Sequence, residues 1–593
     1  MGSVFFAKHV KSVVCALGLC LGAGFAVPVV AHAAPALPPG APPGAQGQID
    51  TVHPEQQFEE PTKPKSGPVD LQIPEGSSAA DEQFEEIKLH LSQVKLEGST
   101  VFPEQVLQDE FASLLNQDVS LADVYRIAEK ITAKYRDAGY VLSRALIPAQ
   151  EISKVEGVVR VTVLEGFVQR IVVEAADDAG ENAKEKLARV EDRIHRYVDR
   201  ILESKPLNIR DLERYLLLAN DMSGVSAKAV LRPDPKVSGA TDLVLKVNFF
   251  SYSGSIGLDS MGSRIVGPEE GMIKGRLNSP LGMGEHIELT SVTASPFKDA
   301  INLKYGGAVV ELPLGDEGAR LKLDATRSVT KPGERLKPLK MVSDTETFAL
   351  SGIYPVIRGR ATNLILEGGV KSMESDVDVL ERPFNVDKLR KWFFKGSFDH
   401  ADSWDGVNLF MVQWSHGYNV DAATQKGSLL SSRAEADPNY QKLDGEISRL
   451  QGLPHNFSLL AAAMWQYAWH PLFSLEEMGV GGEKYGRGYD LGDITGDKGV
   501  AEKVELQYND EFATNSTYQL YTFLDHGHVW NLDKTDQGTN REIEDITSSG
   551  VGVRGTYQKW VNFDLFAAKP MAKIPVNATG DETRWFGRMS INF

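Results

Sequence analysis

The sequence predicts two small α+β units followed by a transmembrane antiparallel β-barrel of about 16 strands. Three observations support this fold class. A signal for export opens the chain, no later stretch could cross a bilayer as a helix, and the spacing of apolar residues changes from helical to strictly alternating near residue 249. An exported chain without a spanning helix is either soluble outside the cytoplasm or a closed barrel, because only helices and closed barrels satisfy their backbone in lipid.

The first 33 residues are predicted to be a secretory signal peptide. A start with two lysines, an apolar run from about residue 13 to residue 30 and the small residues of Ala31-His32-Ala33 are the three parts of such a signal. The alternative is a transmembrane anchor, because the apolar run is long, but the Pro-rich sequence that follows favours cleavage. Both cysteines lie within this segment, so residues 34–593 offer no thiol for a disulfide, a metal ion or a nucleophile.

Residues 34–84 are predicted to be a flexible linker. They are rich in proline, glycine and charged residues, and this composition buries too little apolar surface to offset the entropy of ordering. A short helix around residues 54–60 is weakly indicated. The whole chain carries a net charge of −18, which argues against a nucleic-acid partner.

Residues 85–166 are predicted to form the first α+β unit. Its clearest element is a helix over 120–140, with Ser120 as the N-cap and Gly139 as the stop signal. Apolar residues between these two positions recur at helical spacing. The other elements are strands, at 90–98, 140–148 and 157–166.

Residues 167–248 repeat this plan as a second unit. Asn208 is the predicted N-cap of its second helix. The matching order of elements in two units of ~80 residues suggests an internal duplication, and the alternative is one larger α+β domain. The elements are a strand at 167–175, helices at 189–204 and 209–221, and strands at 226–233 and 241–249.

Residues 249–593 are predicted to form the barrel. Short runs such as 300–305 and 320–328 alternate apolar with polar residues, which gives each strand one lipid-facing side and one polar side. The last strand ends the chain on an aromatic residue. Its apolar face carries Trp585, Met589, Ile591 and Phe593, and its polar face carries Arg588, Ser590 and Asn592.

Two further features support a barrel over a secreted β-sandwich array or β-helix, which show similar alternation. The strand that ends in Phe593 has no tail after it. The tryptophans all lie in this region, where aromatic girdles require them, at positions 392, 404, 414, 465, 469, 530, 560 and 585.

A glycine-rich stretch stands out within the barrel region. Residues 480–499, VGGEKYGRGYDLGDITGDKG, place seven glycines around Arg487. Glycine costs roughly 0.5–1 kcal/mol relative to alanine inside regular structure. Such a segment is expected to turn tightly, to pack its backbone closely or to bind something.

From residue 85 onward the sequence resembles the outer-membrane transporters of two-partner secretion, of the ShlB/FhaC/HecB haemolysin secretion/activation type, which belong to the BamA superfamily. That family has two periplasmic POTRA domains and a 16-stranded barrel. The resemblance implies that residues 85–166 and 167–248 are the POTRA domains. It rests on four stretches, at 134–166, 352–360, 466–499 and 523–527.

The resemblance also implies a site inside the barrel. In the family, the long sixth extracellular loop, here about 477–502, folds into the lumen and carries an aliphatic-Arg-Gly-aromatic tip. The tip here is Arg487, Gly488 and Tyr489, preceded by a glycine where the family has an aliphatic residue. Arg487 is expected to pair with the aspartate of a strand motif that consists of Phe523, Asp525 and Gly527. Its planar guanidinium suits a bidentate contact with one carboxylate.

The function that this resemblance implies is export of one large partner exoprotein. The partner (TpsA type, similar to haemolysins and adhesins) would be captured by the POTRA domains in the periplasm and would pass through the barrel to the cell surface. The strand that ends in Phe593 would be read by the barrel-assembly machinery, and lipid would surround the barrel. The alternatives are an insertase of the BamA or TamA type and a secreted enzyme or binding protein without a barrel.

Two other signals are interpreted as structural, and no cofactor, metal or catalytic residue is predicted. Residues 550–555, GVGVRG, match a dinucleotide fingerprint, but no helix follows them and their valines alternate as in a strand. His526 and His528 lack a third ligand at metal spacing.

Overall fold

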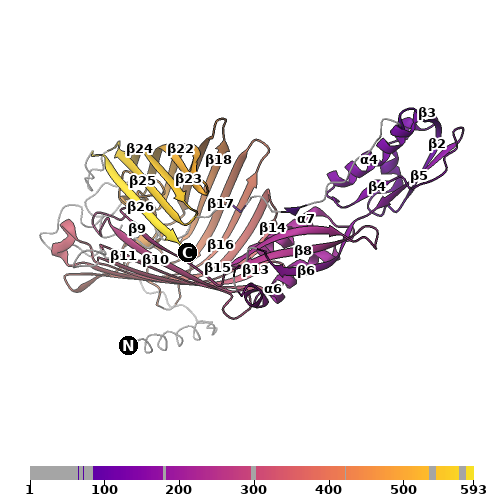
Figure 1. The fold of residues 1–593 in the computed structure, drawn as a ribbon. Helices are drawn as coiled ribbons and strands as arrows, with labels where there is room; N and C mark the ends of the chain where they lie inside the picture. The colour runs from indigo at the N-terminus through magenta and orange to yellow at the C-terminus, as the bar shows by residue number, and fades with distance from the viewer. Residues whose placement is uncertain are drawn as a thin grey trace.

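The computed structural model describes residues 64–65, 71–72, 84–177, 180, 182–295, 302–420, 422–532, 543–572 and 582–593. The predicted signal peptide, the predicted helix at 54–60 and nearly all of the predicted linker lie outside these ranges. Figure 1 shows two α+β units that extend from one end of a barrel. Within the described residues, no helix has both the length and the apolar character needed to cross a membrane.

The first α+β unit contains a four-stranded sheet in the order β3-β2-β5-β4, in which β2 and β5 are parallel. Helix α4 forms where the sequence predicts it. Ser120 and Asp123 make a capping box at its start, and these hydrogen bonds from Ser120 hold the pKa of Asp123 below its ordinary value. The elements are β2 (Lys88–Glu97), α3 (Glu104–Gln108), η3 (Ala112–Leu114), β3 (Gln117–Ser120), α4 (Leu121–Asp137), β4 (Arg144–Leu146) and β5 (Gly157–Leu164).

The second α+β unit has the same core arrangement, because its first strand, β6, is parallel to its last, β8, and β7 is antiparallel to β8. A short strand, β1 (Leu71–Gln72), lies parallel to the outer edge of β7. The predicted helix at 189–204 is divided into α6 and a 3-10 turn, and α5 precedes them. The elements are β6 (Phe167–Ala175), α5 (Ala183–Ala188), α6 (Glu191–Val198), η4 (Asp199–Glu203), α7 (Ile209–Asn220), β7 (Val225–Pro233) and β8 (Ala240–Phe249).

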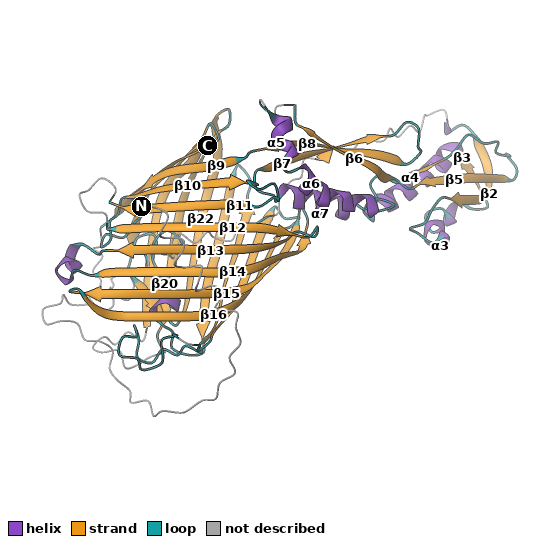
Figure 2. Ribbon diagram, turned by 90° about the horizontal axis from the view of Figure 1, so that it is seen from below, coloured by secondary structure: helices purple, strands orange, loops and turns teal. Residues whose placement is uncertain are grey.

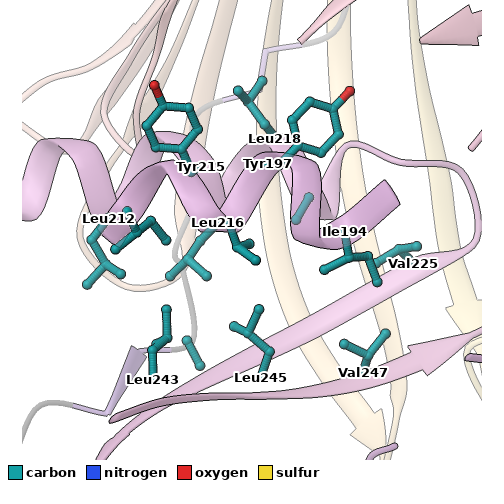
Figure 3. Close-up of a cluster of buried hydrophobic side chains, with 14 of the residues drawn as sticks. Ile194, Tyr197, Leu212, Tyr215, Leu216, Leu218, Val225, Leu243, Leu245 and Val247 are labelled. Atoms are coloured by element: carbon teal, nitrogen blue, oxygen red, sulfur yellow. The ribbon is translucent and has the colours of Figure 1, made fainter. Parts of the chain in front are cut away.

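Helix α7 has two apolar faces, one toward its own sheet and one toward the barrel. In Figure 3, Leu212 and Leu216 point toward Leu243 and Leu245 of β8, while Tyr215 points the opposite way. The hydroxyl of Tyr215 donates to Glu317 in a turn of the barrel, 2.9 Å away.

A buried ion pair reinforces this contact. Asp221, at the end of α7, accepts two hydrogen bonds from the guanidinium of Arg358 at 2.9 and 3.0 Å. The second unit is therefore fixed at that end of the barrel.

In the described part of the chain, sixteen strands close into a barrel in which each strand is antiparallel to its neighbours and β26 pairs back onto β9. The predicted fold class is confirmed. The strands are β9 (Tyr252–Asp259), β10 (Glu270–Asn278), β11 (His286–Ala294), β12 (Leu303–Leu314), β13 (Ala319–Thr330), β14 (Val342–Arg358), β15 (Thr362–Val379), β16 (Arg382–Ala401), β17 (Gly406–Gly417), β18 (Gln441–Gly452), β19 (Phe457–Ala468), β22 (Lys498–Ala513), β23 (Ser516–Trp530), β24 (Ile543–Tyr557), β25 (Val561–Pro570) and β26 (Arg584–Asn592). A 3-10 turn, η5 (Glu334–Leu339), lies between β13 and β14.

The outer face of the barrel is apolar and the inner face is polar. In β26, the side chains of Trp585 and Met589 are exposed on the outside, with relative accessibilities of 80% and 53%. Exposed apolar side chains in every second position of a closed barrel form the surface that a transmembrane barrel presents to lipid. The closed sheet also excludes the predicted alternatives of a β-sandwich array and a β-helix.

Strands β14 to β16 are longer than a bilayer requires. They contain 17, 18 and 20 residues, whereas ~10 residues suffice to span a membrane. Their extra length lies at the end opposite the α+β units. There the outward positions carry charge instead of apolar side chains, for example Glu346 and Glu374, which are Cα partners. These strands therefore extend beyond the lipid on one side of the barrel.

Candidate functional site

The long loop between β19 and β22 lies inside the barrel, because its strands β20 and β21 contact β22, β23 and β24 from the inner side. Figure 2 labels β20 within the outline of the barrel. We call it loop six, because it is the sixth loop at the end opposite the α+β units. It spans residues 469–497, so the predicted range 477–502 begins too late and ends within β22. The loop contains η6 (Ser474–Glu476), β20 (Met478–Val480) and β21 (Ile494–Gly496), and the pairing of β20 with β21 leaves residues 481–493 as its tip.

The structure places Arg487, at the tip of loop six, against Asp525 on β23. The Arg487 side chain donates from Nε to Asp525 Oδ2 at 3.0 Å and from Nη2 to Oδ1 at 2.8 Å. The backbone N–H of Arg487 also donates to Oδ2, at 3.0 Å. One carboxylate thus holds both the side chain and the main chain of the tip, with the planar geometry that only a guanidinium provides.

This contact is shielded from water. The side chains of Arg487 and Asp525 are 7% and 0% exposed. A second carboxylate, Glu505 on β22, accepts from Arg487 Nη1 at 2.7 Å and is 2% exposed. Removal of one partner from such a buried group costs ~3–5 kcal/mol, because a charge is left without compensation in a dry environment.

All three residues of the predicted strand motif point into the bore and contact loop six. The guanidinium of Arg487 stacks on the ring of Phe523, 3.5 Å from its centroid, while Asp525 forms the ion pair. Gly527 leaves room for β20, since a Cβ at this position would lie 2.4 Å from Val480 Cγ1. The spacing of two residues between these positions follows from the alternation of side chains along a strand.

Four glycines of the tip have a positive φ that other residues rarely adopt. Among them, Gly481 has φ +123° and Gly486 has φ +98°. A Cβ on Gly481 would also lie 2.1 Å from the carbonyl oxygen of Asp490, on the other side of the tip. The glycine-rich sequence therefore allows a tight hairpin whose two sides are in contact.

Gly488 and Tyr489 connect the tip to the part of the wall next to β23. A Cβ on Gly488 would lie 2.9 Å from the backbone nitrogen of Pro570 and 2.9 Å from Ser548 Cβ. The hydroxyl of Tyr489 lies 2.5 Å from the carbonyl oxygen of Ala572 and accepts from the Ala572 N–H at 3.1 Å. Both residues thus require the hairpin to lie against β24 and β25.

We expect Gly488→Ala to displace the tip and to reduce the population of docked loop six about tenfold. The added methyl group meets backbone and Cβ atoms that have little freedom to move, and core overpacking typically costs ~1–3 kcal/mol. The measurement is hydrogen exchange of the Arg487 backbone N–H, which donates to Asp525 when the tip is docked. Gly275→Ala is the matched control, because a Cβ there meets nothing within 4 Å. Wild-type protection of this N–H in Gly488→Ala would contradict this role.

The sequence did not identify Glu505 or its second partner, Arg554 on β24. The other carboxylate oxygen of Glu505 accepts from Arg554, so Asp525, Arg487, Glu505 and Arg554 form a chain of alternating charges along the inner wall of β22 to β24. The only available signal was an acidic residue at an inward position of an alternating strand.

A second buried cluster holds the base of loop six. Glu476 lies between two lysines of the barrel wall, 2.7 Å from Lys391 Nζ and 2.8 Å from Lys442 Nζ. The side chain of Glu476 is 1% exposed, and those of the lysines are 7% and 9% exposed. This cluster was not predicted from the sequence.

Asp497 joins loop six to its neighbours. It makes a bidentate ion pair with Arg433 of the loop between β17 and β18, at 2.6 and 3.0 Å. It also accepts from the backbone N–H groups of Leu472 and Leu532. Loop six is thus held at its tip and at its base by separate groups of charges.

Below loop six, toward the α+β units, the bore contains a cavity of about 1260 Å³. Polar side chains from β18 to β25 contribute much of its wall, among them Asn456, Gln507, Gln519 and Asn562. The arrangement provides a polar chamber that ends at a loop held by reversible ionic contacts. Such a geometry suits the passage of a chain better than the chemistry of a small substrate.

Two family models match the chain. The model described as "POTRA domain, ShlB-type" matches residues 89–166, within the first α+β unit. The model described as "Haemolysin secretion/activation protein ShlB/FhaC/HecB" matches residues 239–555, more than half of the chain.

Proteins with similar sequences are named as transporters. The heme/hemopexin transporter protein HuxB of Haemophilus influenzae strain 86-028NP is 22% identical over 82% of this chain and 84% of its own length. The outer membrane transporter CdiB of Escherichia coli strain 536 is 22% identical over 71% of this chain and 69% of its own. A solved structure of CdiB from Escherichia coli has the same fold, with a TM-score of 0.69 at 20% identity, and covers 93% of this chain and 97% of its own.

Proposed function

Because the chain belongs to the haemolysin secretion/activation family ShlB/FhaC/HecB, we propose that it is the outer-membrane pore that recognises one large partner exoprotein and moves it from the periplasm to the cell surface. The observation that carries this function is the family match over residues 239–555, which covers the barrel from β9 into β24. The named relatives, among them the hemolysin transporter protein ShlB of Serratia marcescens, are transporters.

We propose that the two POTRA domains capture the partner in the periplasm. Extended segments bind well to free sheet edges, where main-chain hydrogen bonds supply affinity. In the first unit, β3 and β4 are the outer strands of the sheet. The contacts of Tyr215 and Asp221 with the barrel fix the second unit beside the entrance of the bore, so a captured segment is already close to the chamber.

The partner then enters the polar chamber as an extended chain, and loop six controls its further passage. The ionic contacts of Arg487 and Glu476 keep the loop docked at rest, and their exchange for water and for the transported chain permits displacement. No cofactor or catalytic step is required in this scheme. Folding of the partner outside the cell supplies a driving force.

Assembly of the barrel depends on its last strand in this proposal. The backbone of Phe593 pairs with Gly254 of β9, with N···O distances of 2.8 and 2.9 Å in the two directions, and its ring is exposed toward lipid. We propose that the barrel-assembly machinery recognises this strand before it closes onto β9.

The test is deletion of the gene in its native host. We expect one large protein to disappear from the medium or cell surface, to accumulate or be degraded in the periplasm, and to return when the wild-type gene is restored. The amounts of other outer-membrane proteins should not change. Loss of many outer-membrane proteins without loss of a particular exoprotein would support an insertase of the BamA or TamA type instead.

A further inference from the structure

The barrel is incompletely paired where its first and last strands meet. We call this junction of β9 and β26 the seam. Its ladder has five pairs of Cα partners, from Asp259 with Arg588 to Ser255 with Asn592, whereas β25 and β26 have eight. Residues 584–586 of β26 pair with β25 but have no ladder partner on the β9 side among the described residues. A cavity of about 270 Å³ lies where this ladder ends, lined by Ser260 and Gly587 among others.

A carboxylate of loop six spans this unpaired part of the seam. Asp490 Oδ2 accepts from Nε of Arg264, which follows β9, at 3.1 Å. Asp490 Oδ1 lies 2.7 Å from Nη2 of Arg584, on β26. The Asp490 side chain is 6% exposed, so one buried anion holds cations from both sides of the seam.

A second carboxylate of loop six contacts β26 four residues further along the strand. Glu483 makes two contacts of 2.7 Å with the guanidinium of Arg588 on β26. Arg588 Nε also lies 3.6 Å from Asp259 of β9, which is its Cα partner across the seam. The tip of loop six therefore adds negative charge where cations of β26 face the first strand.

From this geometry we propose that Asp490 is a positioning residue that closes the seam, so that loop six replaces the missing part of the ladder between β9 and β26. Arg264 and Arg584 repel each other unless an anion lies between them, and the anion comes from a loop that is attached to neither strand. This inference goes beyond the proposed export, and its test measures the barrel alone.

A consequence follows for the docked loop. Displacement of loop six removes Asp490 and Glu483 from the seam at the same time as it clears the bore. The opening of the pore and the stability of the barrel wall are therefore coupled through these two carboxylates.

The experiment uses the full-length protein in outer membranes or detergent, with Asp490→Ala and Asp490→Asn. We expect each variant to shorten the half-life of the folded band in semi-native electrophoresis at a fixed high temperature by about tenfold or more, since a buried partner of two cations is lost. Hydrogen exchange should increase at β9 and β26 and stay unchanged at β14 and β15. Lys484→Ala, an exposed charge on the same loop, is the matched control.

A disulfide across the seam distinguishes closure of the seam from a general effect on loop six. Gly257 and Ser590 are Cα partners, and a Cβ on Gly257 would lie 3.5 Å from Ser590 Cβ, which suits a disulfide. We expect the pair Gly257→Cys and Ser590→Cys, when oxidised, to restore the half-life of Asp490→Ala. The control pair Thr345→Cys and Ser375→Cys joins partners on β14 and β15 and should not restore it.

Three results would overturn the proposal. The first is a wild-type half-life for both Asp490 variants. The second is equal restoration by the two disulfides. The third is no restoration by the seam disulfide, which would mean that Asp490 stabilises only the loop. If Asp490→Ala does not assemble, the same comparison is made with Asp490→Asn, which keeps the shape of the side chain.

Discussion

Arg487→Ala is expected to leave a folded barrel and to reduce export of the partner at least tenfold. The substitution leaves Asp525, which is fully buried, without its cation and removes the stacking on Phe523. A cost of ~3–5 kcal/mol to the docked loop shifts its population by a factor of about 10² to 10⁴. A loop that is undocked at all times obstructs the bore and no longer exchanges its contacts in order with the transported chain. The measurement is the amount of partner in the medium per amount of transporter in the outer membrane.

Two control variants distinguish loss of the contact between Arg487 and Asp525 from a general loss of positive charge. Lys484→Ala removes an exposed cation from the same loop and should export normally. Arg487→Lys keeps the charge but loses the fork that contacts both oxygens of Asp525, so it should export at an intermediate level. Normal export by Arg487→Ala would show that the tip contact is dispensable.

Glu476→Gln is expected to destabilise the whole barrel by ~3–5 kcal/mol. The substitution leaves two lysines, Lys391 and Lys442, buried side by side without a counter-charge. Their mutual repulsion then acts in surroundings of low polarity. The measurement is the denaturant midpoint or the temperature at which the folded band is lost.

The control for this prediction is an exposed pair on a neighbouring loop. Lys426 and Glu435 lie 3.0 Å apart, but their side chains are 50% and 37% exposed, so Glu435→Gln should cost ~0–1 kcal/mol. A triple variant with Lys391→Met, Lys442→Met and Glu476→Leu should recover much of the lost stability, since apolar replacement of a buried ion cluster is often neutral. Equal effects of Glu476→Gln and Glu435→Gln would contradict the role of the buried cluster.

The sequence predicted the barrel and the contact at the tip for different reasons. Alternation of apolar and polar residues, as in the last strand, is a local property of the sequence. It directly predicts a sheet with one face in lipid. The contact between Arg487 and Asp525 joins positions far apart in the chain. It was expected because each residue lies in a short motif that resembles a known family, not because the spacing shows it.

The clusters at the base and the seam were not predicted because their partners depend on how loop six enters the closed barrel. Glu476 meets Lys391 and Lys442 from two different strands, and Asp490 meets residues near both ends of the barrel sequence. A strand pattern shows that such residues face inward. It does not show which of the many inward charges become neighbours.

Element lengths were also predicted less well than element types. The helix expected at 189–204 ends as a 3-10 turn, and α5 was not expected. The estimate of ~10 residues for each strand holds for many strands but fails for β22 to β24, with 16, 15 and 15 residues, and most of all for β14 to β16. Their outer parts continue the sheet by pairing and by packing on loops, and lipid no longer sets their composition.

The one-sided extension of β14 to β16 has a consequence at the cell surface. A strand of 20 residues reaches ~60 Å at ~3 Å per residue, about twice what the bilayer needs, so this part of the wall stands well above the lipid headgroups. A polypeptide that emerges from the bore has this wall on one side and open water on the other.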